Sequence, residues 1–271
     1  MENSMDAVSS RDFITETLFC LAAIEANVSR LASELILWST KEFGFIEISD
    51  EFSSTSSIMP QKKNPDILEI MRARSSKVHG SLAAALSMVR GLSNSYNRDF
   101  QELSPLLGDS FKITKESLFL LGKIIKTLKI NKERMADACE GGFITATELS
   151  DLLVKEKGLP FRTAHRIVGG AVRQAIKEGK GPSEIDLDFL GEVPGWPGGI
   201  SESKIKDALS PFSAVKMKNH PGAPAPDACI KAISEKAQAI SKREAELSGR
   251  MEKVENSKIL LLKTAKKLAG G

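Results

Sequence analysis

The sequence predicts an all-α protein, a bundle of long helices followed by a smaller helical domain. Apolar residues recur at steps of three, four or seven over long stretches, which is the period of an amphipathic helix. No stretch alternates between apolar and polar residues over a useful length, which counts against strands. After residue 129 the predicted helices shorten and glycine and proline become frequent, so we expect domains at residues 1–129 and 130–271.

The first long helix is predicted from Ser9 to Phe43. Ser9 or Ser10 can cap its start, and Gly44 stands where the helix should end. Its apolar stripe consists of Ile14, Leu18, Leu21, Val28, Leu31, Leu35 and Trp38.

Two more long helices are predicted to begin at an Asn–Pro and a Ser–Pro pair. Asn64 is expected to cap the second helix, with Pro65 as its first helical residue. Small residues fill the interior of this helix, which places it in the middle of a bundle. Ser104 and Pro105 repeat the pattern for the third helix. Three helices leave apolar bundle surface uncovered, which favours oligomerisation or a missing partner segment.

The remaining chain predicts short helices near 144–157 and 160–178, then turns around short helices between 180 and 226. The last segment, 227–268, is predicted as one helix with a seven-residue apolar repeat. That repeat consists of Ile233, Ile240, Leu247, Val254, Leu261 and Leu268. Glu244 and Lys258 interrupt the neighbouring row, so we expect the helix to dock on its own protein rather than form an independent coiled coil.

Composition narrows the possible functions. The net charge of +3, from 38 Lys and Arg against 35 Asp and Glu, is too balanced to indicate nucleic acid. No apolar run reaches the length of a membrane span, and the first residues lack the pattern of a signal peptide. Cys20, Cys139 and Cys229 are far apart and odd in number, which favours reduced thiols over disulfides or a metal site. We therefore expect a cytoplasmic protein without a metal.

The stretch most informative about chemistry is the loop at residues 53–65. It places the hydroxyls of Ser56 and Ser57 and the ammonium groups of Lys62 and Lys63 just before a helix start. Unpaired backbone N–H groups at a helix start attract anions, and the lysines add to this attraction. Judged on composition alone, a solvated basic turn is the simpler interpretation.

The order of residues in this loop favours an enzyme. The pattern S-S-I-M-P-x-K-x-N-P at 56–65 resembles the signature of the fumarase/aspartase superfamily, and Q-K-K-N-P-D at 61–66 resembles argininosuccinate lyases. Residues 3–13, 96–102 and 158–165 resemble three further segments of that family. The resemblance covers most of the chain and weakens in its last forty or so residues.

The resemblance implies a fold, an assembly and a reaction. It implies a long-helix bundle that assembles as a homotetramer, with each active site built from three subunits. The implied reaction is β-elimination of argininosuccinate to arginine and fumarate in arginine biosynthesis, in the cytoplasm, with no cofactor, nucleic acid or membrane involved. The difficult intermediate is a carbanion delocalised into a carboxylate, which fixed cationic and N–H donors can stabilise.

The resemblance also assigns roles to individual residues. Ser56 matches the residue that abstracts the proton, and a serine must be activated before it can act as a base. Lys62 and Asn64 match ligands of the succinyl carboxylate. Glu69 matches a glutamate that orients a histidine, although an acid in the first turn of a helix is favourable without any such role. The other substrate-binding positions implied are Arg11, Ser57, Tyr96 and Gln101. For Arg11, a surface arginine at a helix start is an equally good interpretation.

The sequence departs from the family in three respects. Thr55 stands where a glycine is usual, and Ser104 stands where many relatives carry a substrate-contacting lysine. The region upstream of the Asn3 segment, which supplies the assisting histidine, is absent. We therefore expect an incomplete, inactive or weakly active fragment. A non-catalytic helical scaffold and a lyase with another succinyl substrate are the alternatives.

Overall fold

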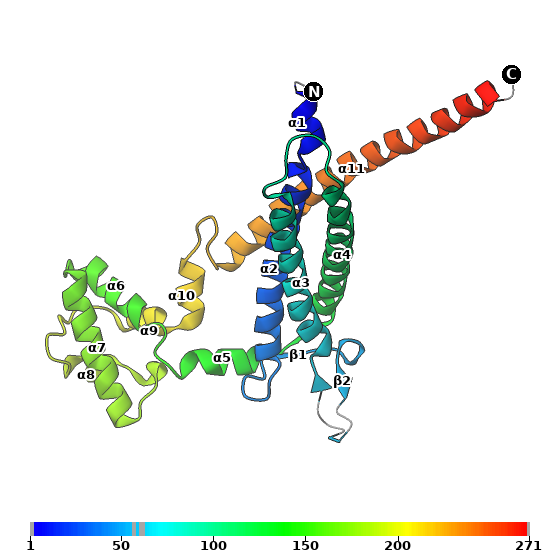
Figure 1. Cartoon of the computed structure of the whole chain (residues 1–271). Coiled ribbons are helices and arrows are strands. Elements are labelled where there is room, and N and C mark those ends of the chain that lie inside the picture. Colours follow the sequence, from blue (N-terminus) through cyan, green and yellow to red (C-terminus); the bar gives the residue numbers. More distant parts are fainter. Residues whose placement is uncertain (1–2, 56–57, 60–62, 270–271) are drawn as a thin grey trace. The chain divides into compact units, whose positions relative to one another are not determined.

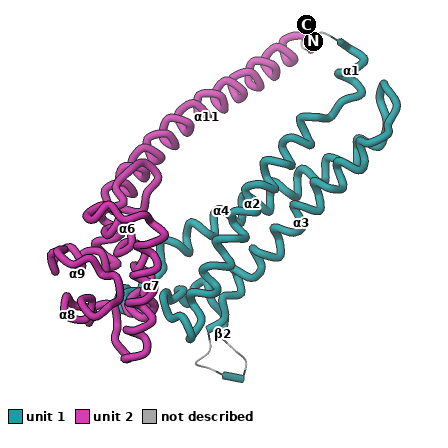
Figure 2. The backbone as a smooth tube through the Cα atoms, turned by 90° about the vertical axis from the view of Figure 1, so that its left-hand side faces the viewer, with its two compact units in different colours: residues 1–136 teal, residues 137–271 magenta. Residues whose placement is uncertain are grey.

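The computed structural model describes residues 3–55, 58–59 and 63–269, and these residues form eleven α-helices (Figure 1). The described strands are four, each of two residues, so the all-α prediction is confirmed. The chain divides into two compact units, residues 1–136 and 137–271 (Figure 2). The division falls inside helix α5 (Lys132–Glu140), shortly after the predicted domain end at residue 129.

The first unit is a bundle of three long helices, each antiparallel to the one before it. These are α2 (Asp12–Trp38), α3 (Asp66–Val89) and α4 (Leu103–Thr127), and each packs against the other two (Figure 1). Their contact faces carry aliphatic side chains at helical spacing, and the fully buried large ones include Leu18, Leu68, Leu103, Ile124 and Val78. Burial of these side chains is the main favourable contribution to the stability of the bundle.

The predicted start of the first helix is wrong. A separate short helix, α1 (Ser4–Ser9), comes first and is capped by Asn3, whose Oδ1 accepts hydrogen bonds from two backbone N–H groups. Helix α2 then begins at Asp12, with Arg11 rather than Ser9 or Ser10 at the cap position. The end also lies earlier than expected, at Trp38, because residues 39–44 form a turn that finishes at Gly44 with a φ of 61°.

The predicted starts of the other two long helices are each displaced by one or two residues. Asn64 lies in strand β3 (Lys63–Asn64), and Pro65 takes the cap position of α3. Helix α4 begins at Leu103, directly after the 3₁₀ helix η2 (Arg98–Glu102), so Ser104 is inside the first turn. A proline is tolerated there because the first-turn N–H groups have no intrahelical partner.

Short antiparallel pairs close the lower end of the bundle. Strand β1 (Ile46–Glu47) pairs with β4 (Lys129–Ile130), which joins the segment after α2 to the segment after α4. Between β1 and the loop lies the 3₁₀ helix η1 (Asp50–Phe52), whose Phe52 is buried in the core. Strand β2 (Ser54–Thr55) pairs with β3.

The second unit has its own core, formed by short helices. The helices that surround it are α6 (Ala146–Lys157), α7 (Phe161–Glu178), α8 (Leu187–Gly191), α9 (Glu202–Leu209) and α10 (Pro211–Met217), with the 3₁₀ helix η3 (Pro182–Glu184). Leu149, Leu153 and Leu190 are almost completely buried in it. The buried Thr145 hydroxyl donates a hydrogen bond of 2.8 Å to the carbonyl of Leu209, which joins the start of α6 to the end of α9.

The chain ends with one long helix, α11 (Pro226–Ala269), close to the predicted range. None of its residues is buried, so the helix does not pack into the core of the second unit. Among the described residues, no helix is both long enough and apolar enough to cross a membrane.

Candidate functional site

The base of the signature loop is held by backbone pairing and by a side chain. Ser54 pairs with Asn64 and Thr55 with Lys63, so the two arms of the loop run antiparallel where they meet α3. The Ser54 hydroxyl donates a hydrogen bond to the Asp66 carboxylate in the first turn of α3. Ser56, Ser57 and Lys62 lie outside the described residues, so their predicted roles rest on the sequence.

Lys63 is held by two carboxylates at this base. Its Nζ lies 2.7 Å from Glu47 Oε1 and 2.5 Å from Asp50 Oδ1, and Lys129 approaches the other oxygen of Glu47 at 3.4 Å. Hydrogen bonds from Lys63 hold the pKa values of Glu47 and Asp50 below their usual range, while Asp50 and Glu47 raise the pKa of Lys63. Because Lys63 is paired with these two carboxylates, the predicted binding of a substrate anion in the loop depends on Lys62.

Replacing Lys63 with methionine should raise the pKa values of both Glu47 and Asp50 towards 4.5 and 3.8, because each loses its main hydrogen-bond donor. Both pKa values are lowered in the folded state, so the two carboxylates stabilise the folded wild-type chain at pH values above their unfolded pKa. This stabilisation is lost as the pH falls through the folded pKa. The free energy of unfolding of the variant should therefore fall less steeply below pH 4.5. NMR titration of the two carboxylates measures the shift directly.

The matched control for this variant is Lys129→Met. Lys129 contributes less than Lys63 to Glu47 and least of all to Asp50. The control should raise the pKa of Glu47 slightly and leave that of Asp50 almost unchanged. Equal shifts in the two variants would contradict the assignment of Lys63 as the main partner.

Asn64 lies beside these charges, and Glu69 follows in the first turn of α3. Asn64 lines a pocket of about 80 Å³ together with Ser53, Glu47 and Lys63. That volume is small beside the roughly 300–1,000 Å³ of typical ligand pockets. Glu69 is exposed on the first turn of α3. The described residues of one copy therefore form only part of a substrate-binding site at the loop base.

A second group of predicted residues lies at the opposite end of the bundle. The Arg11 guanidinium stacks over the ring of Phe100, 4.3 Å from its centroid, and donates hydrogen bonds to two backbone carbonyls before α2. The Gln101 amide donates to the Tyr96 hydroxyl at 3.3 Å, and Tyr96 meets Phe100 edge to face. Arg11, Tyr96 and Gln101 therefore form one cluster around Phe100, which we call the Phe100 cluster.

The predicted site residues that the structure describes lie in two places, not one. Asn64 and Glu69 lie at the start of α3, whereas the Phe100 cluster lies beyond its end, at the top of Figure 1. Helix α3 has 24 residues and is about 36 Å long. A small substrate cannot touch both groups of one copy.

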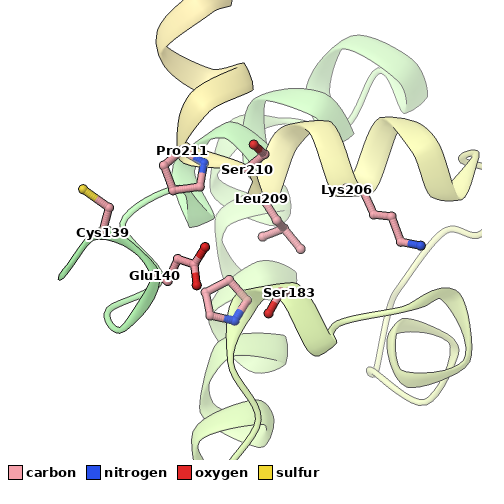
Figure 3. A pocket seen from close by; sticks show the side chains of 8 residues that line it. Cys139, Glu140, Ser183, Lys206, Leu209, Ser210 and Pro211 are labelled. Carbon is pink, nitrogen blue, oxygen red and sulfur yellow. The ribbon is translucent and has the colours of Figure 1, made fainter. Parts of the chain in front are cut away.

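Other candidate features lie away from these two groups. In the second unit a pocket of about 280 Å³ is lined by Cys139, Glu140, Ser183 and Lys206, among others, and no predicted site residue borders it (Figure 3). Within the described part of the chain, no three His, Cys, Asp or Glu side chains are placed to hold a metal ion. His165 is exposed and lies against Phe161, one turn earlier on α7.

Sequence reasoning missed a buried carboxylic acid in the first unit. Glu25 of α2 is completely buried, and neither carboxyl oxygen has a hydrogen-bond partner among the described residues. Burial raises the pKa of this carboxyl, and the nearby Ser117 and Thr114 hydroxyls offset part of that rise. A signal was available, since Glu25 falls on the apolar stripe between Leu21 and Val28.

Comparison with known proteins agrees with this architecture. Residues 1–80 match the Lyase family model, and residues 143–216 match the model for the C-terminal region of argininosuccinate lyase. An EDDS lyase variant with bound fumarate superposes with a TM-score of 0.78 at 33% identity, over 92% of this chain and 50% of that one. A class II fumarase from Schistosoma mansoni, 17% identical with a TM-score of 0.56, shares the fold over 66% of this chain and 38% of its own. The fold is that of the fumarase/aspartase superfamily of lyases.

Curated relatives of known name identify the kind of lyase that the chain resembles. An argininosuccinate lyase from Methanocaldococcus jannaschii is 48% identical over 97% of this chain and 54% of the relative. One from Methanothermobacter thermautotrophicus is 45% identical over 87% of this chain and 51% of the relative. The chain is a homologue of argininosuccinate lyases over nearly its whole length, and it spans about half the length of the curated relatives it matches.

Proposed function

We propose that this chain carries the central and C-terminal part of an argininosuccinate lyase, which cleaves argininosuccinate to arginine and fumarate. The observation that supports this most is the identity of 44% to 48% with argininosuccinate lyases over 97% of the chain. That stretch includes the loop at 53–65, so the homology extends through the predicted catalytic segment.

In the proposed mechanism, Ser56 takes the proton from the carbon beside the succinyl carboxylate. Negative charge then develops on that carboxylate, and Lys62 and Asn64 stabilise it. Fixed donors of this kind stabilise a developing charge most strongly in a site that excludes water. Glu69 orients a histidine that the upstream region supplies and that protonates the leaving guanidino group. Arg11, Ser57, Tyr96 and Gln101 hold the substrate. Lys63 keeps the loop base closed through Glu47 and Asp50.

The separation of the two residue groups supports a site shared between copies. Asn64 and Glu69 of one copy and the Phe100 cluster of another complete one site, which agrees with a homotetramer. A site assembled in this way also accounts for the small pocket at the loop base, because the missing walls come from a neighbouring copy. The cytoplasm is the proposed compartment, and no cofactor takes part in the mechanism.

The test is release of fumarate from argininosuccinate, followed by ultraviolet absorbance. The isolated chain should release little or none. Addition of the upstream region of a homologous lyase should produce activity, because it supplies the histidine and the other substrate contacts. An assembled pair of correct stoichiometry that releases no fumarate overturns the proposal.

A lyase that releases fumarate from another succinyl compound is the second candidate. The similarity to an EDDS lyase with bound fumarate favours it, although the identity of 33% is lower than to the argininosuccinate lyases. The same assembled pair should therefore be given EDDS in parallel. Fumarate release from EDDS but not from argininosuccinate would select this second candidate.

A further inference from the structure

Helix α11 carries a continuous apolar row that the core of the second unit leaves uncovered. The row, which we call the aliphatic row, consists of Ile233, Ile240, Leu247, Val254, Leu261 and Leu268. Each of these side chains is between 56% and 79% exposed. A spacing of seven keeps them on one face of the helix, and a helix of 44 residues extends about 66 Å. A stripe of this length is typical of a helix that pairs with another helix.

A second row runs beside the first and contains two charges. This mixed row consists of Ile230, Ala237, Glu244, Met251, Lys258 and Ala265. Together the two rows have the alternating spacing of three and four that defines a two-helix seam. Glu244 and Lys258 are the members that decide which partner the seam accepts.

The charges in the mixed row disfavour parallel pairing with a second copy. In a parallel pair each residue of the mixed row faces its own counterpart. Glu244 would then face Glu244, and Lys258 would face Lys258, at two points of one seam. Like charges held together in an apolar seam destabilise the pair and select against it.

Antiparallel pairing removes both conflicts. The mixed row of one copy then faces the aliphatic row of the other. With Met251 opposite Val254, Lys258 of the second copy lies opposite Leu247, three residues from Glu244. Three residues correspond to about 4.5 Å along the axis, within reach of an ion pair across the seam. Long side chains can also bring such charges to the edge of the seam.

The flanking positions agree with the same register. Arg243 and Arg250 border the seam on one side, and in this register they lie opposite Thr264 and Ser257 of the second copy. Shifting the register by one heptad towards fuller overlap would place Arg250 opposite Arg250. The charge pattern therefore favours the register that pairs Met251 with Val254.

We propose that α11 is an interaction surface for a second copy of this chain, paired antiparallel in that register. The inference goes beyond the proposed enzymatic function, because it concerns none of the predicted site residues. Glu244 and Lys258, which in the sequence argue against a coiled coil, are in this proposal the residues that select a second copy in antiparallel orientation.

The test measures distances between spin labels in the full chain by pulsed electron–electron double resonance. Cys20, Cys139 and Cys229 are replaced by serine, and a single labelled cysteine is placed at Asn256 or at Glu235, both on the outer face of α11. The antiparallel pair gives a distance of about 25 Å for Asn256, set mainly by two helix diameters. For Glu235 the offset along the axis alone is about 52 Å.

Charge reversal supplies the second readout. Glu244→Lys should remove most of the short distance at Asn256, because the introduced ammonium group then lies beside Lys258 of the second copy. Adding Lys258→Glu should restore it. Two short distances, at Asn256 and at Glu235, would instead show parallel pairing and overturn the proposal. Absence of any short distance at Asn256 would also overturn it, and would leave α11 to dock on its own chain or on another protein.

Discussion

A mixture of two variants of low activity, Ser56→Ala and Gln101→Ala, should release fumarate from argininosuccinate when the variants assemble together. Each variant is combined with the upstream region that the proposed function requires. Ser56→Ala removes the proposed base, and loss of an activated nucleophile or base lowers rates by about 10²–10⁴-fold. Gln101→Ala removes a polar contact from the Phe100 cluster, which should cost about 10–100-fold. The mixture should recover far more activity than either alone.

The recovery follows from the geometry of α3. The loop end and the Phe100 cluster of one copy are separated by the length of this helix, so the proposed shared site takes them from different copies. Random assembly of equal amounts leaves about a quarter of such sites with neither lesion. Fumarate release is measured after co-refolding and compared with a mixture of Ser56→Ala and Asn64→Ala, whose lesions lie at the same end. Equal failure of both mixtures would show that one copy supplies the whole site.

Replacement of Glu25 with methionine is expected to raise the free energy of unfolding at pH 7 by about 1–3 kcal/mol, the usual cost of burying a polar group without a partner. The side chain is completely buried on α2, near Thr114 and Ser117 of α4, and methionine fills a similar volume. Loss of the contribution that the Thr114 and Ser117 hydroxyls make to the carboxyl reduces this gain without reversing it, because that contribution offsets only part of the effect of burial. Urea unfolding of the two proteins gives the difference.

The same variant should change the dependence of stability on pH. The pKa of Glu25 is raised in the folded state above its ordinary value of 4.5. The folded state thus holds this proton more tightly, and the group's favourable contribution is lost as the pH rises from 4.5 through the folded pKa. Glu25→Met should flatten that decline, and Glu34→Met, at an exposed position of the same helix, should not. A less stable Glu25→Met protein would indicate that the carboxyl has a partner.

The sequence was sufficient to predict the helices but not their first residues. Periodicity indicates which face of a segment is buried. Helices α2 and α11 lie close to their predicted ranges, and α3 and α4 begin within two residues of their predicted starts. The first residue of a helix depends on which of several neighbouring residues takes the cap position. Asn64 has the chemistry of a cap, yet pairing with Ser54 in a strand removes it from that position. On α2, the apolar period predicts Leu31 in the buried stripe, whereas Ala32 is the buried residue. Side-chain size misled this assignment, because a close helix contact selects the smaller residue.

Resemblance to the family singled out Asn64, Tyr96 and Gln101, and their roles stay predictions. One-dimensional spacing contains no information on which end of the bundle each residue occupies. The role of Lys63 was also beyond the sequence. Its partners Glu47 and Asp50 precede it by more than ten residues and meet it only after β1 and η1 have formed.

The rigidity of α3 has a consequence for how the proposed enzyme responds to dilution. Because a helix of about 36 Å cannot fold back to join its own ends, no motion within a copy substitutes for a neighbour. Specific activity should then depend on protein concentration, falling when the assembly dissociates even though every subunit stays folded. The rate at which the polypeptide is made would then also set its specific activity, and a cell that makes too little of it loses flux more steeply than in proportion.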